Sequence, residues 1–167
     1  YREGNEGTWL ANNDYSKYDG WLGDEECYRG TVMYGDKRFI PCWDGTTRIT
    51  PLTDGNTKLI YSAFDLANCA GTNPGIIKIM EDVDLGAKVF NPLTNISKLL
   101  GEGKTIYNMK IETTFNTNSW DGGGFIRRCS AATIENITFK NADVKVTHVT
   151  GSDGDAYASI VCGTAEG

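Results

Sequence analysis

The heptapeptide Thr105-Ile-Tyr-Asn-Met-Lys-Ile111 returns as Thr133-Ile-Glu-Asn-Ile-Thr-Phe139, and a shorter version precedes both as Glu81-Asp-Val-Asp-Leu85. Each copy places an Asn or Asp before two apolar residues that are separated by one polar residue. These Asn and Asp positions, 82, 108 and 136, lie 26 and 28 residues apart. Apolar residues two apart point to one side of a strand. Repeats of this length built on such strands are typical of a solenoid.

If the copies align, the apolar members of each pair stack in register and the polar residue between them faces outward. We therefore expect Met109, Ile111, Ile137 and Phe139 to be buried, and Lys110 and Thr138 to face solvent. An antiparallel β-sandwich also alternates apolar and polar residues, so it is the alternative that alternation alone leaves open. The repeated phrase favours the solenoid.

Residues 62–70 are predicted to form the one convincing helix. Ser62 is a suitable N-cap, Asp65 stands three residues later as in a capping box, and Phe64 and Leu66 begin an apolar stripe. Gly71 is a natural helix stop. We expect this helix to cover the N-terminal end of the repeats; a helix packed on a lateral face is the alternative.

Residues 1–42 form a separate N-terminal segment, aromatic and acidic, and residues 43–167 form the helix and the repeats. Gly35-Asp36 lies between two strand-like runs and predicts a β-hairpin. Its pairing would bring Cys27 near Cys42, either as a disulfide in an oxidising compartment or as two unpaired thiols. The repeats stop in mid-phrase at the C-terminus, so we expect them to continue in a longer protein.

Composition excludes several classes of partner. The 167 residues carry a formal net charge of -6 with 40% hydrophobic and 23% charged residues, and no Lys/Arg cluster breaks the acidic pattern. Such a surface is a poor match for nucleic acid or an anionic membrane. No apolar run is long enough to insert into a bilayer. The five cysteines include no CxxC pair, which argues against a zinc site.

The phrases Trp43-Asp-Gly-Thr46, Ser62-Ala-Phe-Asp-Leu-Ala67, Gly101–Ile111 and Ala132–Asn141 together resemble secreted or surface proteins of the Bacteroides type with GLUG-like repeats. The resemblance covers roughly residues 43–167. It implies a right-handed single-stranded parallel β-helix, a pectate-lyase-like solenoid of the all-β class, preceded by a short N-terminal capping helix and a hairpin segment. It also implies an extracellular or cell-surface location and an adhesin-like or glycan-associated role.

Catalytic signals are weak. A glycosidase needs two carboxylates across the scissile bond, and the close pairs are Asp82/Asp84 and Asp153/Asp155. The first pair is explained by a turn and an exposed strand face. The second lies in Gly151-Ser-Asp-Gly-Asp155, which is similar to a Ca²⁺ loop but lacks its downstream ligands. Arg127-Arg128, which a polysaccharide lyase could use, is interpreted as an exposed turn. We expect no catalytic residues and no cofactor other than Ca²⁺ at Asp153 and Asp155.

Binding is the better-supported class. Trp120-Asp121 lies in a Thr- and Asn-rich insert, where solenoids place their binding loops. A Trp face beside a carboxylate suits sugar stacking and hydroxyl hydrogen bonds. The sequence therefore predicts an adhesin-like, non-catalytic module that recognises a glycan or a host surface protein. The alternatives are the N-terminal part of a carbohydrate-active enzyme (lyase or glycoside hydrolase), a structural stalk, or a phage receptor-binding solenoid.

Overall fold

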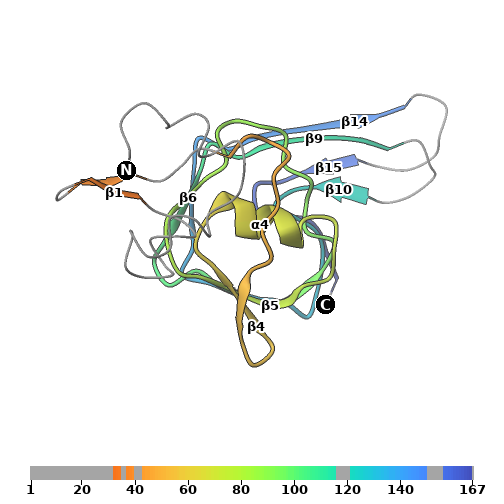
Figure 1. The fold of residues 1–167 in the computed structure, drawn as a ribbon. Coiled ribbons are helices and arrows are strands. Elements are labelled where there is room, and N and C mark those ends of the chain that lie inside the picture. Colours follow the sequence, from red (N-terminus) through yellow and green to blue (C-terminus); the bar gives the residue numbers. More distant parts are fainter. Residues whose placement is uncertain (1–31, 35–36, 40–42, 116–120, 150–155, 167) are drawn as a thin grey trace.

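The computed structural model describes residues 32–34, 37–39, 43–115, 121–149 and 156–166. Strands dominate these residues and surround one short helix, α4 (Ala63–Cys69) (Figure 1). In chain order the strands are β1 (Val32–Tyr34), β2 (Lys37–Phe39), β3 (Leu52–Asp54), β4 (Thr57–Ile60), β5 (Gly75–Ile79), β6 (Val83–Asp84), β7 (Ile96–Leu100), β8 (Thr105–Tyr107), β9 (Lys110–Phe115), β10 (Asp121–Gly123), β11 (Ile126–Ser130), β12 (Thr133–Glu135), β13 (Thr138–Lys140), β14 (Asp143–His148), β15 (Ala156–Ala158) and β16 (Cys162–Glu166).

Within the described residues the strands form six small sheets. The largest has the order β12-β7-β5-β4-β3 and is mixed, because β3 and β4 pair antiparallel while its other neighbours pair parallel. The sheets β13-β8-β6, β14-β9, β10-β15 and β11-β16 are parallel throughout. The remaining pair, β1 and β2, is antiparallel about residues 35–36, as the sequence predicted.

This sheet arrangement corrects the predicted fold class, a right-handed single-stranded parallel β-helix of the pectate-lyase type. The strands are divided among several small mixed and parallel sheets, and the antiparallel pair β3–β4 lies at one edge of the largest. The physical reason is that apolar alternation specifies which side of a strand is buried. It does not specify the strand's partner or the direction in which the two pair.

The spacing between partner strands also differs from the predicted 26 and 28 residues. Val83 of β6 pairs with Ile106 of β8, which is 23 positions later, and Ile106 pairs with Phe139 of β13, which is 33 positions later. The second interval is longer because it includes β10 and the residues between β9 and β10. Thr105 therefore pairs with Thr138, and the two Thr-Ile dipeptides that look equivalent in the sequence do not pair with each other.

Burial follows this corrected register. Met109 and Ile111 have 0% exposure, as predicted. Ile137 and Phe139 are only half-buried, and Thr138 between them is exposed. The predicted burial of that second pair is wrong because it belongs to the last set of paired strands, β12 to β14. No further strand pairs with that set among the described residues.

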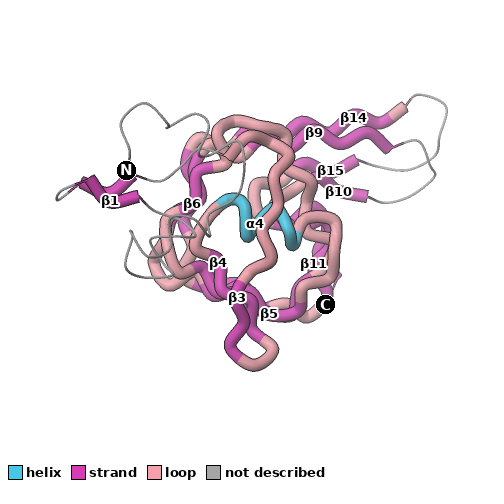
Figure 2. The backbone as a smooth tube through the Cα atoms, viewed as in Figure 1, coloured by secondary structure: helices cyan, strands magenta, loops and turns pink. Residues whose placement is uncertain are grey.

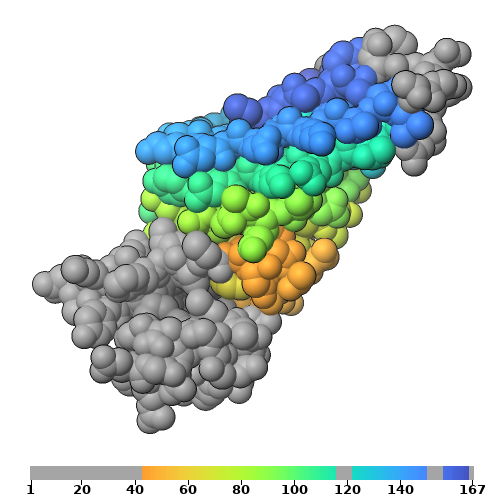
Figure 3. Space-filling model, turned by 90° about the horizontal axis from the view of Figure 1, so that it is seen from above, coloured from red at the N-terminus to blue at the C-terminus, as the bar shows by residue number. Residues whose placement is uncertain are grey.

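Aromatic rings connect the successive parts of the core. Trp43 meets Phe90 edge-on at 6.1 Å between ring centroids, Phe90 stacks on Phe125 at 5.7 Å, and Phe125 meets Phe139 edge-on at 5.3 Å. Offset-stacked and edge-on pairs at these distances are the favoured aromatic geometries. The same order from N- to C-terminus is visible as bands of colour along the molecule in Figure 3.

The helix forms where the sequence predicted it. Ser62 is the N-cap, and its Oγ accepts a hydrogen bond from the Asp65 backbone N–H at 3.4 Å while Asp65 Oδ2 accepts from the Ser62 N–H at 3.1 Å. This capping box satisfies backbone donors at the first turn. Phe64 and Leu66 are buried in the same core as the strands. In Figure 2 the helix lies across the ring that the strands and loops trace.

Candidate functional site

Most of the residues predicted to bind a ligand lie outside the described part of the chain. They are Trp120, Asp153 and Asp155, together with both cysteines of the predicted disulfide, Cys27 and Cys42. Asp121 is described only by its backbone, which begins β10 and pairs in parallel with Ala156 of β15. The structure therefore leaves the Trp120–Asp121 site as a prediction, and the described residues must be searched for another candidate.

The other Trp-Asp-Gly motif that the structure describes has a structural role. Trp43 is buried at 4% exposure, and its indole N–H donates a hydrogen bond to the Thr47 carbonyl at 2.8 Å. Asp44 is exposed, and its carboxylate accepts hydrogen bonds from Thr46 and Thr47. Burial raises the pKa of Asp44, but these hydrogen bonds outweigh it, and the net pKa is lowered. This aromatic ring offers no face to a sugar.

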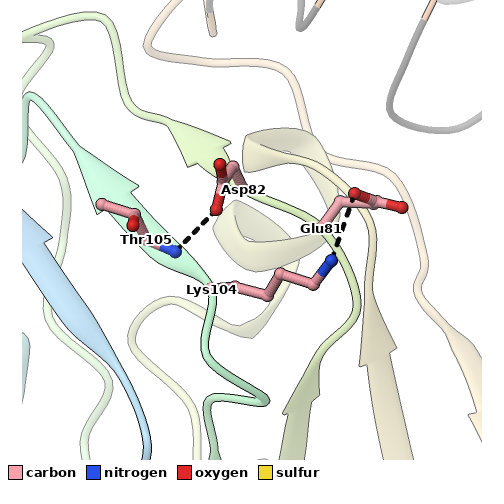
Figure 4. A network of polar contacts seen from close by, with 4 residues as sticks. All are labelled: Glu81, Asp82, Lys104 and Thr105. Atoms are coloured by element: carbon pink, nitrogen blue, oxygen red, sulfur yellow. Dashed lines mark hydrogen bonds and ion pairs between the residues drawn. The ribbon is translucent and has the colours of Figure 1, made fainter.

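The carboxylates of Asp82 and Asp84 are also engaged within the fold. Asp82 Oδ1 accepts a hydrogen bond from the Thr105 backbone N–H at 2.7 Å, next to an ion pair between Glu81 and Lys104 at 3.6 Å (Figure 4). Asp84 Oδ1 accepts from the Gly86 N–H at 2.8 Å and from Asn108 Nδ2 at 2.9 Å. These contacts join neighbouring strands and explain both aspartates without catalysis.

Two cavities share the side chains of Thr94 and Arg127, and together we call them the Thr94–Arg127 pocket. Their volumes are about 250 and 430 Å³. The larger is of the size that small-molecule sites commonly have. The walls come from segments that are far apart in the sequence: Gly71, Asn73, Asn91, Pro92, Thr94, Asn95, Thr113, Gly122, Arg127 and Arg128.

Backbone hydrogen bonds fix the walls of this pocket. Leu93 forms a parallel bridge with Ile126, and the Arg127 N–H donates to the Leu93 carbonyl at 2.7 Å. On the other side, the Thr94 N–H donates to the Thr72 carbonyl at 3.0 Å. Side chains carried on paired strands are positioned more accurately than those on loops. The pocket is therefore built on the rigid part of the fold.

The pocket is polar and positively charged. Arg127 and Arg128 are both exposed, and the Arg127 guanidinium lies over the Phe115 ring, 5.3 Å from its centroid. The side chains around them are amides, hydroxyls and small residues, and no carboxylate is among the described lining residues. Asn95 contributes a buried Oδ1 with no hydrogen-bond partner among the described atoms. A buried acceptor left in this way favours a donor from a ligand.

A disulfide joins the strands beside the pocket. Cys129 of β11 and Cys162 of β16 are bonded, with their Cα atoms 6.3 Å apart. This pairing was not predicted, since only Cys27 and Cys42 were considered. The two strands pair in parallel, and Ile126 is the partner of Cys162 in that register. The cross-link holds the segment that carries both pocket arginines.

Two further findings bear on ligands and location. No three His, Cys, Asp or Glu side chains gather closely enough to hold a metal ion in the part of the chain that the structure describes. Asp153 and Asp155 are outside that part, so Ca²⁺ binding there stays a prediction. Among the described residues, no helix has the length and apolar character needed to cross a membrane.

No family model, curated protein sequence or solved structure matches this chain. The sequence interpretation missed the pocket because it treated Arg127-Arg128 as an exposed turn, whereas both residues lie within β11. The signal that could have revealed it is the spacing of 33 residues that relates β8 to β13. The same spacing places Leu93-Thr94-Asn95 beside Ile126-Arg127-Arg128.

Proposed function

We propose that the chain is a non-catalytic, adhesin-like binding module of a secreted or cell-surface protein and that it recognises a glycan in the Thr94–Arg127 pocket. The observation that carries this proposal is the pocket's lining. Asn73, Asn91, Thr94 and Asn95 place amide and hydroxyl groups around one cavity system. Sugar hydroxyls both donate and accept hydrogen bonds, and amides and hydroxyls can do the same.

The disulfide supports the proposed location. Bonds such as Cys129–Cys162 form and persist in oxidising compartments, which include the bacterial periplasm and the cell exterior. The resemblance to surface proteins of the Bacteroides type leads to the same compartment. An extracellular module would meet polysaccharides and host glycans directly.

The engagement of Asp82 and Asp84 favours binding over glycoside hydrolysis. A glycosidase needs one carboxyl group to act as an acid and a second to act as nucleophile or base. Here Asp82 accepts from Thr105, and Asp84 accepts from Gly86 and Asn108. Both aspartates thereby have structural partners.

A glycan array probed with the 167-residue chain tests this function. We expect binding to a subset of saccharides, and we expect Thr94→Val to weaken it because the pocket hydroxyl is lost while side-chain shape is kept. Thr133→Val on β12, exposed and away from the pocket, is the matched control. A parallel assay for polysaccharide cleavage addresses the enzyme alternative. Turnover by this chain, or an array with no bound saccharide, would contradict the proposal.

A further inference from the structure

The pocket carries a concentrated positive charge on an acidic chain. The formal net charge is -6, yet Arg127 and Arg128 are neighbours on β11 and both line the larger cavity. No carboxylate is among the described residues that line the pocket with them. We propose that the glycan taken by the Thr94–Arg127 pocket is anionic, a saccharide bearing a carboxylate or a sulfate ester. This inference rests on the proposed glycan-binding function and adds the chemical class of ligand.

The arginines are held for this role by the backbone beneath them. The Arg127 N–H donates to the Leu93 carbonyl at 2.7 Å, and the Arg128 N–H donates to the Thr94 carbonyl at 3.3 Å. The Arg127 carbonyl in turn accepts from Thr164 Oγ1 at 3.4 Å. The Cys129–Cys162 bond follows directly on the same strand. A strand fixed on both sides limits the motion that its side chains would lose on binding.

The Phe115 ring adds to the orientation of one guanidinium. Arg127 lies over this ring at 5.3 Å, within the range of a cation–π contact, and the ring itself is 5% exposed. Arginine suits planar anions because its guanidinium donates two parallel hydrogen bonds to a carboxylate or to two oxygens of a sulfate. A guanidinium oriented over an aromatic ring presents those donors with less freedom to lose.

The neutral part of the pocket favours a saccharide over a simple anion. Asn95 Oδ1 is a buried acceptor without a partner among the described atoms, and an anion has no proton to offer it. A sugar hydroxyl supplies one. Thr94 lines both cavities and lies between the amides of residues 91 and 95 and the two arginines. One sugar ring with an acidic substituent would satisfy both sets of groups.

Calorimetric titration with two matched pairs of ligands tests this inference. The first pair is tetragalacturonic acid and its fully methyl-esterified form, and the second is a κ-carrageenan tetrasaccharide and its desulfated form. We expect one or both anionic members to bind about tenfold or more tightly than the neutral partner, with affinity that falls as salt rises. Binding of the uronate alone or of the sulfate alone would identify which anion is preferred, and both outcomes support the inference.

The variant Arg127→Gln/Arg128→Gln should lose about tenfold or more of the affinity for the anionic member and little for the neutral one. Arg48→Gln, an exposed arginine outside the pocket, is the control and should bind like the wild type. Equal affinity for both members of each pair, or no effect of the double substitution, would overturn the inference. If none of the four ligands binds while the array yields neutral sugars, only the anion selectivity fails. If the array also yields none, the proposed function fails with it.

Discussion

Asn141 donates a hydrogen bond from its side-chain Nδ2 to Oδ1 of Asn108 at 3.2 Å, across two neighbouring parallel strand segments. Asn108 in turn donates from Nδ2 to Asp84 Oδ1 at 2.9 Å. The three side chains thus form a ladder at equivalent turns of successive parts of the chain. Asn108 and Asn141 both adopt a positive φ, 53° and 55°, which Asn tolerates better than most residues.

Removing the middle of this ladder should destabilise the fold. Asn108→Ala loses both side-chain hydrogen bonds and places a Cβ residue without compensation at φ 53°, so we expect a loss of about 2 kcal/mol in the free energy of unfolding. Asn108→Gly keeps the easy backbone geometry and should lose less. Chemical denaturation measures both variants. Wild-type stability for Asn108→Ala would show that the ladder contributes nothing.

Gly101 is required by a close approach of two backbones. A Cβ at this position would lie 2.2 Å from the Asn136 carbonyl oxygen, which is backbone and cannot move aside easily. We expect Gly101→Ala to cost about 2–3 kcal/mol, the range for overpacking in a well-packed interior. Gly55→Ala is the control because nothing lies within 4 Å of its Cβ and only its φ of 55° opposes the change. Equal thermal shifts for the two variants would contradict this account of the turn.

The Cys129–Cys162 bond should contribute substantially to stability. It closes a loop with a sequence separation of 33 residues, for which chain entropy predicts about 3–4 kcal/mol. The double variant Cys129→Ser/Cys162→Ser should therefore unfold at a lower denaturant concentration than the wild type. Peptide mapping without reduction should recover the two cysteines as one cross-linked pair. Recovery of both as free thiols would refute the bond.

Cys69 is a buried thiol, and its ionisation should be suppressed. Burial raises its pKa, with a smaller opposing effect from Lys58 and a further raising effect from Asp65. Because the folded pKa lies above the unfolded value, the stability linked to this proton is fully present below about pH 8.5 and is lost as the pH rises above it. Between pH 7 and 10, the stability of the wild type should fall more than that of Cys69→Ala. Identical pH profiles would contradict the shift.

Local features of the fold could be predicted from the sequence because they depend on a few adjacent residues. Ser62 and Asp65 define the helix start, and the Gly35-Asp36 dipeptide predicts the pairing of β1 with β2. The buried pair Met109 and Ile111 follows from strand alternation alone. These signals do not depend on the rest of the chain.

The pairing of distant strands could not be predicted in the same way. The likeness of residues 105–111 to residues 133–139 suggested a spacing of 28, but Asn136 instead lies at another turn, where its carbonyl accepts from the Gly103 N–H at 2.8 Å. An Asn suits either turn, so the motif does not identify its partner. The error in spacing hid the pocket, because Thr94 and Arg127 become neighbours only at a spacing of 33.

The central claim, that the Thr94–Arg127 pocket is the glycan site, is tested most directly by NMR titration of the ¹⁵N-labelled chain with the tighter-binding of tetragalacturonic acid and the κ-carrageenan tetrasaccharide. The account predicts that the amide signals of Thr94, Asn95 and Arg127 shift most, in proportion to the fraction bound. It would be contradicted if those signals stayed unchanged, or if the largest shifts fell on Trp120 and Asp121.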